Sequence, residues 1–354
     1  MTARESARTL PTPLVLKGAP GSPYTRKMVA LLRYRRLPYR YLVAGSPQLA
    51  GLPVPKVELL PTFYWADAAG VMQARTDSSP LLREFDAAFP ERRVRPADPV
   101  LSLLDSLLED YADEWLTKAM FHYRWHYQAD IDRAGDILPR WRGITASDAR
   151  AAELNALFSK RQIDRLWVVG SNENTWQLIE DSYRRLLNAM EDHFRQLPFL
   201  LGKRPGASDF GFYGQLNQLT HFDPTPMAVA LETAPRVFAW VDLMEDLCGA
   251  EPQTDDWLDP AQPPDTLLTL MGEVARTYVP VMLANAHALA RGDKEVNCVV
   301  DGVAWRQQAF PYQGKCVRWL REERAALAHT QRRAVDHVLE RSACLSLFTD
   351  NIGT

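Results

Sequence analysis

The chain has 354 residues, 46% of them hydrophobic and 24% charged, with 41 Lys and Arg against 44 Asp and Glu. This composition is typical of a globular protein with two or three domains, and a net charge of −3 offers no basic face for nucleic acid. No apolar run approaches the roughly 18 residues that a membrane span needs. The four cysteines form neither a CxxC pair nor a disulfide framework. We therefore expect a reduced, cytoplasmic protein without a membrane or nucleic-acid partner.

The first ninety residues alternate strand and helix signals. Apolar runs at 13–19 and 39–44 predict two strands, and the helical stretch 23–36 between them predicts a crossover that makes them parallel. After a segment rich in Pro and Gly, residues 59–75 predict two more strands around the turn composition ADAAG. A helix then starts at Ser79 and Pro80. The predicted order is β-α-β, loop, β-β-α.

From residue 99 onward the pattern becomes helical. Helices are predicted at 99–128, 146–166, 175–196, 208–221 and 235–247, with prolines between several of them. A linker-like stretch leads to an extension with a helix at about 265–290, a hairpin over 295–308 that turns at Asp301 and Gly302, and a last helix at about 315–343. The sequence therefore predicts an α/β part, an all-helical part and a mostly helical extension with a β-hairpin.

Two helix starts carry polar side chains that could do more than cap. Ser22 and Pro23 have the residue types of an N-cap and a first-turn position. The alternative is that the Ser22 hydroxyl, held at the positive end of a helix, meets a ligand. Asp77 and Ser78, shortly before Pro80, pose the same choice between capping and binding an amino-acid end, which carries an ammonium and a carboxylate on one carbon.

Three motifs in this order resemble the N-terminal domain of the glutathione S-transferase family. They are SPYTRK after the first strand, Pro61 in LLPTFYW ahead of the hairpin, and the run from Thr76 to Asp86 after it, which ends in SPLLREFD. The segments FLLGKRPGASDFGFYGQL and DPTPMAVALETAPRVFAWVDLMEDL resemble the sixth and seventh helices of that family. The resemblance covers about residues 12–250. It implies a thioredoxin-like glutathione-binding domain at 12–91 and a helical substrate domain at 99–250. An extension at 262–346, which we expect to pack on the helical domain, lies outside it.

The resemblance also implies glutathione as co-substrate and a homodimer. Ser22 falls on the position that activates the thiol, with Tyr24 and Thr25 as alternatives. A thiol has a pKa of about 8.5, so a hydroxyl that donates to the sulfur at a helix N-terminus favours the nucleophilic thiolate.

The remaining family positions concern the rest of the tripeptide. The peptide bond before Pro61 is expected to be cis, so that the Leu60 backbone pairs with the cysteinyl part of glutathione. Val57 falls at the position where, in this family, the segment before the cis-proline comes close to the tripeptide. Lys56 is expected to contact the glycine carboxylate.

Asp77 and Ser78 match the pair that holds the γ-glutamyl end. Asp209 falls where the family has a buried aspartate at a helix start, and Gly206 stands where a capping Ser or Thr is usual.

An aromatic face of the long helix leaves two interpretations open. Tyr111, Trp115, His122 and His126 are either core residues or the wall of an acceptor pocket. His122 and His126 are four residues apart, as metal-binding pairs are, but no HExxH motif and no third ligand is evident, so we expect no metal.

These observations favour an enzyme that activates the thiol of glutathione for attack on a small, hydrophobic electrophile. One alternative is a non-catalytic binding or interaction protein on the same fold, with the extension as its contact surface or a cover over the site. Another is glutathione-dependent cleavage of an ether or thioether.

Overall fold

A computed structural model gives the structure of residues 10–141 and 143–352. The N-terminal part holds a four-stranded sheet of order β2-β1-β3-β4, in which β1 and β2 are parallel and β3 and β4 run antiparallel to their neighbours. This is a thioredoxin-like arrangement, as predicted. Its elements are β1 (Leu14–Gly18), α1 (Pro23–Tyr34), β2 (Tyr39–Val43), η1 (Pro47–Leu49), β3 (Thr62–Ala66), β4 (Met72–Arg75) and α2 (Ser78–Ala88).

The second part is all-helical and starts with one long, interrupted helix. That helix consists of α3 (Pro99–Tyr111), the π-helical segment η2 (Ala112–Leu116) and α4 (Thr117–His126). The following elements are α5 (Gln128–Arg140), α6 (Asp148–Ile163), η3 (Leu166–Val169), α7 (Trp176–His193), α8 (Ala207–His221), α9 (Pro224–Thr233), α10 (Pro235–Met244) and η4 (Thr254–Asp256). The sequence prediction missed α5 and α9. Prolines explain both omissions, since Pro139 lies inside α5 and Pro224 and Pro226 open α9, where we expected breaks.

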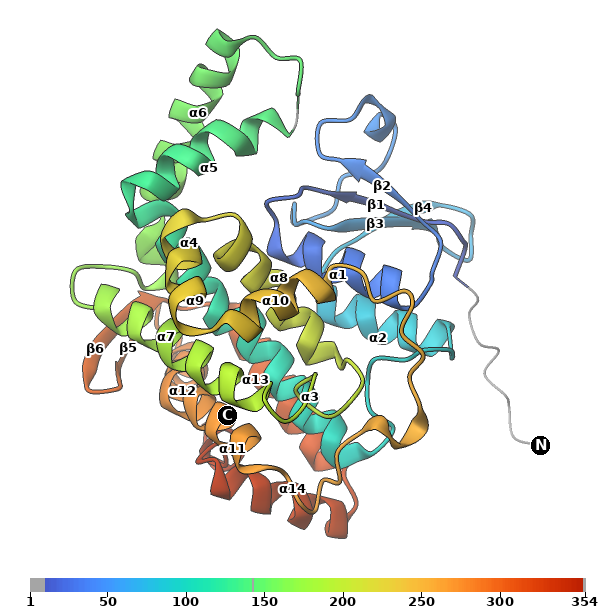
Figure 1. Cartoon of the computed structure of the whole chain (residues 1–354), viewed down its shortest axis with the longest axis vertical. Helices are drawn as coiled ribbons and strands as arrows, with labels where there is room; N and C mark the ends of the chain where they lie inside the picture. The colour runs from blue at the N-terminus through green and yellow to red at the C-terminus, as the bar shows by residue number, and fades with distance from the viewer. Residues whose placement is uncertain (1–9, 142, 353–354) are drawn as a thin grey trace.

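The extension forms further helices and one hairpin on the side of the helical part away from the sheet (Figure 1). It contains α11 (Asp265–Glu273), η5 (Val274–Tyr278), α12 (Val279–Arg291), β5 (Glu295–Val300), β6 (Val303–Gln308), α13 (Pro311–Ala326), α14 (His329–Arg341) and α15 (Ser346–Thr349). The single last helix predicted at 315–343 is wrong. Leu327 is buried in an extended conformation and breaks it in two, and both halves pack on α3.

Among the described residues, one helical stretch has the length and composition of a membrane span. It runs over Asp265–Arg291, and 56% of its apolar window is buried inside the protein. A helix in the hydrophobic core of a globular protein has the same length, composition and burial. The sequence prediction of no such run overlooked this stretch.

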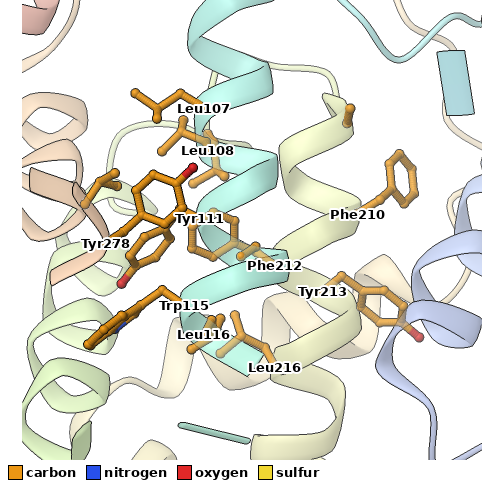
Figure 2. Packing of buried hydrophobic residues seen from close by; sticks show 14 of the residues in the cluster. Leu107, Leu108, Tyr111, Trp115, Leu116, Phe210, Phe212, Tyr213, Leu216 and Tyr278 are labelled. Carbon is orange, nitrogen blue, oxygen red and sulfur yellow. The ribbon is translucent and has the colours of Figure 1, made fainter. Parts of the chain in front are cut away.

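One hydrophobic core joins the three parts. Helix α1 packs along α8, and α3 packs on α8 from the helical side. Tyr34 and Phe210 bring their ring centroids to 5.7 Å across the first contact. Figure 2 shows Tyr111 of α3 beside Tyr278 of the extension, and their ring centroids lie 6.2 Å apart. The extension is therefore part of the folded core rather than an appended tail.

The start of α8 depends on two buried carboxylates. Asp209 accepts from the backbone N–H of Gly206 at 2.8 Å and of Leu200 at 3.0 Å. Asp105 of α3 accepts from Ala207 and Ser208 at 3.2 and 2.9 Å, so it takes the place of the missing capping hydroxyl. A Cβ at Gly206 would lie 2.6 Å from Asp105 Oδ1, which explains why glycine replaces the usual Ser or Thr.

We predict that this pair makes stability fall with rising pH. Burial raises the pKa of Asp209 to about 8 and that of Asp105 to about 7. Both groups bind their protons more tightly in the folded than in the unfolded chain. The free energy of unfolding therefore declines as the pH rises from about 4 toward 8. Urea unfolding at several pH values measures this decline. Asp209→Asn should make it shallower, and an unchanged slope would contradict the assignment.

Candidate active site

Ser22 lies between the end of β1 and the start of α1. Its backbone is extended and it is the N-cap of α1, with its Oγ accepting from the Thr25 N–H at 3.2 Å and Pro23 following at the first helical position. The same hydroxyl donates to the carbonyl oxygen of Leu60 at 3.3 Å. The hydroxyl proton is thus held by one long hydrogen bond, which is readily exchanged for a better acceptor.

The loop that carries Ser22 is fixed by the helical part. Arg124 of α4 donates from Nη1 to the Gly21 carbonyl at 3.1 Å, and its guanidinium is held by Asp223 at 2.9 to 3.0 Å. The Pro20 carbonyl accepts from Arg26 Nε at 3.0 Å and from Gln218 Nε2 at 3.3 Å. Arg124 is buried and anchors this loop.

A cavity of about 190 Å³ opens beside Ser22. One wall comes from the sheet side, with Ala19, Gly21, Ser22, Val43 and Leu60. The other wall comes from the helical part and is almost wholly apolar; it consists of Leu138, Pro139, Trp141, Leu154 and Phe158. In Figure 1 the helices α5 and α6 that carry this wall form a pair on the sheet's side of the bundle.

Glycine at position 21 is needed for the two walls to meet. A Cβ there would lie 2.4 Å from Leu138 Cδ2 and 2.7 Å from the Trp141 ring. A side chain at position 21 would therefore displace the Leu138 and Trp141 side chains and change this apolar wall.

Tyr24 and Thr25 lie close to Ser22 in sequence but do not line the cavity. The Tyr24 hydroxyl donates to the Asp113 carbonyl at 2.8 Å, and burial together with the Asp113 and Glu114 carboxylates raises its pKa. The Thr25 side chain is buried, and its Oγ1 accepts from the Ala19 N–H at 3.3 Å. Of the three hydroxyls, Ser22 alone is placed toward the cavity.

The peptide bond between Leu60 and Pro61 is cis, as the sequence predicts. Pro61 is buried at the start of β3, while Leu60 faces the cavity. Lys56 and Val57, in contrast, lie in an exposed loop and do not line the cavity. The predicted contact of Lys56 with a carboxylate stays a prediction.

Asp77 and Ser78 open α2 but are engaged with different neighbours. The Ser78 hydroxyl accepts from Lys27 Nζ at 3.3 Å. The Asp77 carboxylate accepts from the hydroxyl of Tyr312, a residue of the extension, at 2.8 Å. Neither Asp77 nor Ser78 lines the cavity beside Ser22.

The aromatic face of the long helix lies apart from this cavity. Tyr111 and Trp115 are buried in the central core, Trp115 against Trp305 of β6 at 5.2 Å between ring centroids. His122 is fully buried between Ser171 Oγ at 2.8 Å and Glu180 Oε1 at 3.2 Å, and His126 stacks on it. None of the four lines the cavity beside Ser22. The burial of Tyr111, Trp115 and His122 agrees with the interpretation as core residues, and an acceptor-pocket role for this face stays a prediction.

The apolar wall of the cavity was missed by the sequence prediction. Leu154 and Phe158 lie one helical turn apart in the predicted helix 146–166, and Ile137, Leu138 and Trp141 have helical spacing in α5. That spacing was a usable signal, but Pro139 concealed it.

Comparison with known families identifies the two parts. A model described as the N-terminal domain of glutathione S-transferase matches residues 16–93, and one described as the C-terminal domain matches residues 147–243. The chain belongs to the glutathione S-transferase family. The resemblance drawn from the motifs is thus confirmed, and so is the predicted fold class. The extension beyond residue 243 lies outside both matches.

Two solved structures with some likeness to this member of the glutathione S-transferase family come from bacteria. A glutathione S-transferase of Methylobacterium radiotolerans, in complex with glutathione sulfonate, is 18% identical over 69% of this chain and 99% of its own, with a TM-score of 0.39. A family member from Pseudomonas fluorescens, with two glutathione bound, is 13% identical over 65% of this chain and 86% of its own, with a TM-score of 0.38. No curated protein matches the chain. Likeness this slight says nothing about the ligand of this chain.

Proposed function

We propose that the protein is a glutathione transferase that uses Ser22 to activate the thiol of glutathione. The observation that carries the proposal is the position of the Ser22 hydroxyl, at the N-terminus of α1 and facing an apolar cavity, in a chain of this family. In this proposal the Leu60 backbone pairs with the cysteinyl part of the tripeptide, and Asp77 and Ser78 hold its γ-glutamyl end.

Activation of glutathione requires a modest stabilisation of the negative charge on its thiolate. The thiol of glutathione loses its proton to water, and the Ser22 hydroxyl turns from the Leu60 carbonyl to donate to the thiolate. Lowering the thiol pKa by about two units requires roughly 2.7 kcal/mol. A charge-assisted hydrogen bond at about 1.5–3 kcal/mol, together with a helix N-terminus at about 0.3–1 kcal/mol, is sufficient.

The thiolate then attacks an electrophilic carbon, and a sulfur–carbon bond forms. In a substitution the leaving group departs with its bonding electrons, whereas in an addition a proton from water completes the product. The electrophile lies against the apolar wall formed by α5 and α6. A volume of about 190 Å³ is below the roughly 300–1,000 Å³ that drug-sized ligands occupy, which favours a small substrate.

A non-catalytic binding protein is the second candidate. The observation that favours it is the contact between Asp77 and Tyr312, since the extension, which lies outside both family matches, reaches a carboxylate that the first proposal assigns to glutathione. Ether or thioether cleavage would use the same thiolate, on a different electrophile.

Binding and turnover assays on the full chain test the proposal. We expect millimolar glutathione to raise the melting temperature, because a ligand that binds only the folded chain stabilises it. The shift should be lost in Asp77→Ala and kept in the control Asp255→Ala, which changes an exposed aspartate. Thioether formation from 1-chloro-2,4-dinitrobenzene should accompany binding. Binding without turnover on a panel of electrophiles favours the second candidate, and the absence of both contradicts the proposal.

A reducing, cytoplasmic setting and a homodimer belong to the same proposal. All four cysteines are unpaired in the structure. Sedimentation of the purified chain measures the oligomeric state directly.

A further inference from the structure

The Asp77 carboxylate is turned away from the helix that it precedes. Asp77 is the N-cap residue of α2, yet its side chain makes no capping hydrogen bond, although aspartate is among the best caps. Its backbone has φ 83° and ψ 106°, a conformation that is strained for a residue with a side chain. Backbone strain of this kind persists where surrounding contacts hold the residue in place. Here the contacts are with α13 of the extension, toward which the Asp77 carboxylate points.

Both oxygens of Asp77 meet α13. Oδ1 accepts from the Tyr312 hydroxyl at 2.8 Å, and Oδ2 lies 3.6 Å from Lys315 Nζ. The Lys315 ammonium also lies over the Trp319 ring, 4.1 Å from its centroid. Residues 312, 315 and 319 share one face of α13, so this helix presents a hydroxyl and a cation side by side to Asp77.

Helix α13 is a rigid carrier for these groups. Gln313 donates to Glu114 of η2 at 3.0 Å, and Glu323 accepts from Ser106 of α3 at 3.0 Å and pairs with Arg95. Cys316, Val317 and Leu320 are buried on the face that packs on α3. Lys315 is, by contrast, 39% exposed, and Asp77 is 16% exposed. The pair is therefore held in place and remains open to solvent.

We propose that Tyr312 and Lys315 of the extension complete the γ-glutamyl site, an inference that rests on the proposed function. Asp77 binds the ammonium of the γ-glutamyl end, and Lys315 binds its carboxylate. Tyr312 is a positioning residue that orients Asp77. The γ-glutamyl end carries a positive and a negative charge on one carbon, and the Asp77–Lys315 pair offers the opposite charges 3.6 Å apart.

The neighbouring Ser78 explains why a further cation is useful. Its hydroxyl oxygen already accepts from the buried Lys27 ammonium at 3.3 Å. Lys27 itself is committed to Glu109 and Asp113 and lies out of reach of solvent. Lys315, in contrast, contacts Asp77 directly and is accessible to solvent.

Calorimetric titration of the full chain with two ligands tests the assignment. The ligands are glutathione and γ-aminobutyryl-cysteinylglycine, which keeps the ammonium but lacks the α-carboxylate. Lys315→Gln should weaken glutathione about tenfold, as expected for loss of one charge-assisted hydrogen bond. It should leave the affinity for the second ligand unchanged, and Lys315→Arg should restore glutathione binding. Tyr312→Phe should weaken both ligands, because both need Asp77.

Lys294→Gln is the matched control, since Lys294 is an exposed lysine of the same extension. The melting temperature of each variant without ligand serves to check that α13 stays folded. Equal or tighter glutathione binding by Lys315→Gln overturns the assignment, and tighter binding would mean that Lys315 competes with the ligand ammonium. If the unmodified chain binds neither ligand, the proposed function itself fails.

Discussion

Replacing Ser22 with alanine should raise the pKa of the thiol in bound glutathione by about two units, back toward 8.5. At pH 6.5 the ionised fraction would then fall roughly 50-fold. A less stabilised thiolate is intrinsically more nucleophilic, which returns part of this loss, so we expect turnover to fall roughly five- to tenfold at pH 6.5. Above about pH 9, where both thiols are ionised, only the difference in nucleophilicity remains, so the order should reverse and the variant should be the faster enzyme. Ultraviolet absorbance of the bound thiolate against pH measures the pKa, and initial rates measure turnover.

Two variants make this result specific to the hydroxyl. Ser22→Thr keeps both the hydroxyl and the N-cap, so it should retain the low thiol pKa. Ser22→Ala also removes the cap that accepts from the Thr25 N–H, at a cost of about 1 kcal/mol in stability, so rates are compared well below the melting temperature. If Tyr24→Phe rather than Ser22→Ala raises the thiol pKa, the role belongs to Tyr24.

Lys27→Met should lower the free energy of unfolding by about 3–5 kcal/mol. Lys27 lies in the interface of α1, α2 and η2, where its ammonium donates to Glu109 at 2.7 Å and to Asp113 at 2.6 Å. Burial by itself would lower the pKa of Lys27, but the two carboxylates outweigh it and raise the pKa above its usual range. Without the cation, two buried carboxylates face each other unpaired. Chemical denaturation monitored by tryptophan fluorescence measures the loss.

The exposed pair of Lys160 and Asp164 provides the control. Its atoms approach to 2.7 Å, as in the buried cluster, but the two side chains are 76% and 58% exposed. Lys160→Met should change stability by less than about 0.5 kcal/mol. Adding Glu109→Gln and Asp113→Asn to Lys27→Met should recover part of the loss, because the buried charges are then removed together. A loss below about 1 kcal/mol for Lys27→Met would mean that water reaches this cluster.

The order of the elements in the first ninety residues and the family can both be read from the amino-acid sequence alone. Strand and helix periodicities are local, and so are turn signals such as Asp301-Gly302, which lies between β5 and β6 as predicted. The same holds for the pairing of Ser22 and Pro23 at the start of α1 and for the position of Asp209 at the start of α8. Each of these features depends on neighbours within a few residues, and local chemistry is what a sequence displays directly.

Which side chains meet depends instead on how the helices and the sheet pack together. Ser22, Tyr24 and Thr25 are equally plausible in the sequence, and the packing of α1 against η2 turns Tyr24 to the Asp113 carbonyl and leaves Ser22 at the cavity. An aromatic stripe on a helix has the same spacing whether it faces the core or a pocket, so the position of Tyr111 depended on what covers α3. The contact between Asp77 and Tyr312 joins residues 235 positions apart. Such contacts are set by the packing of whole helices, because no local pattern specifies which distant surface will cover a given side chain.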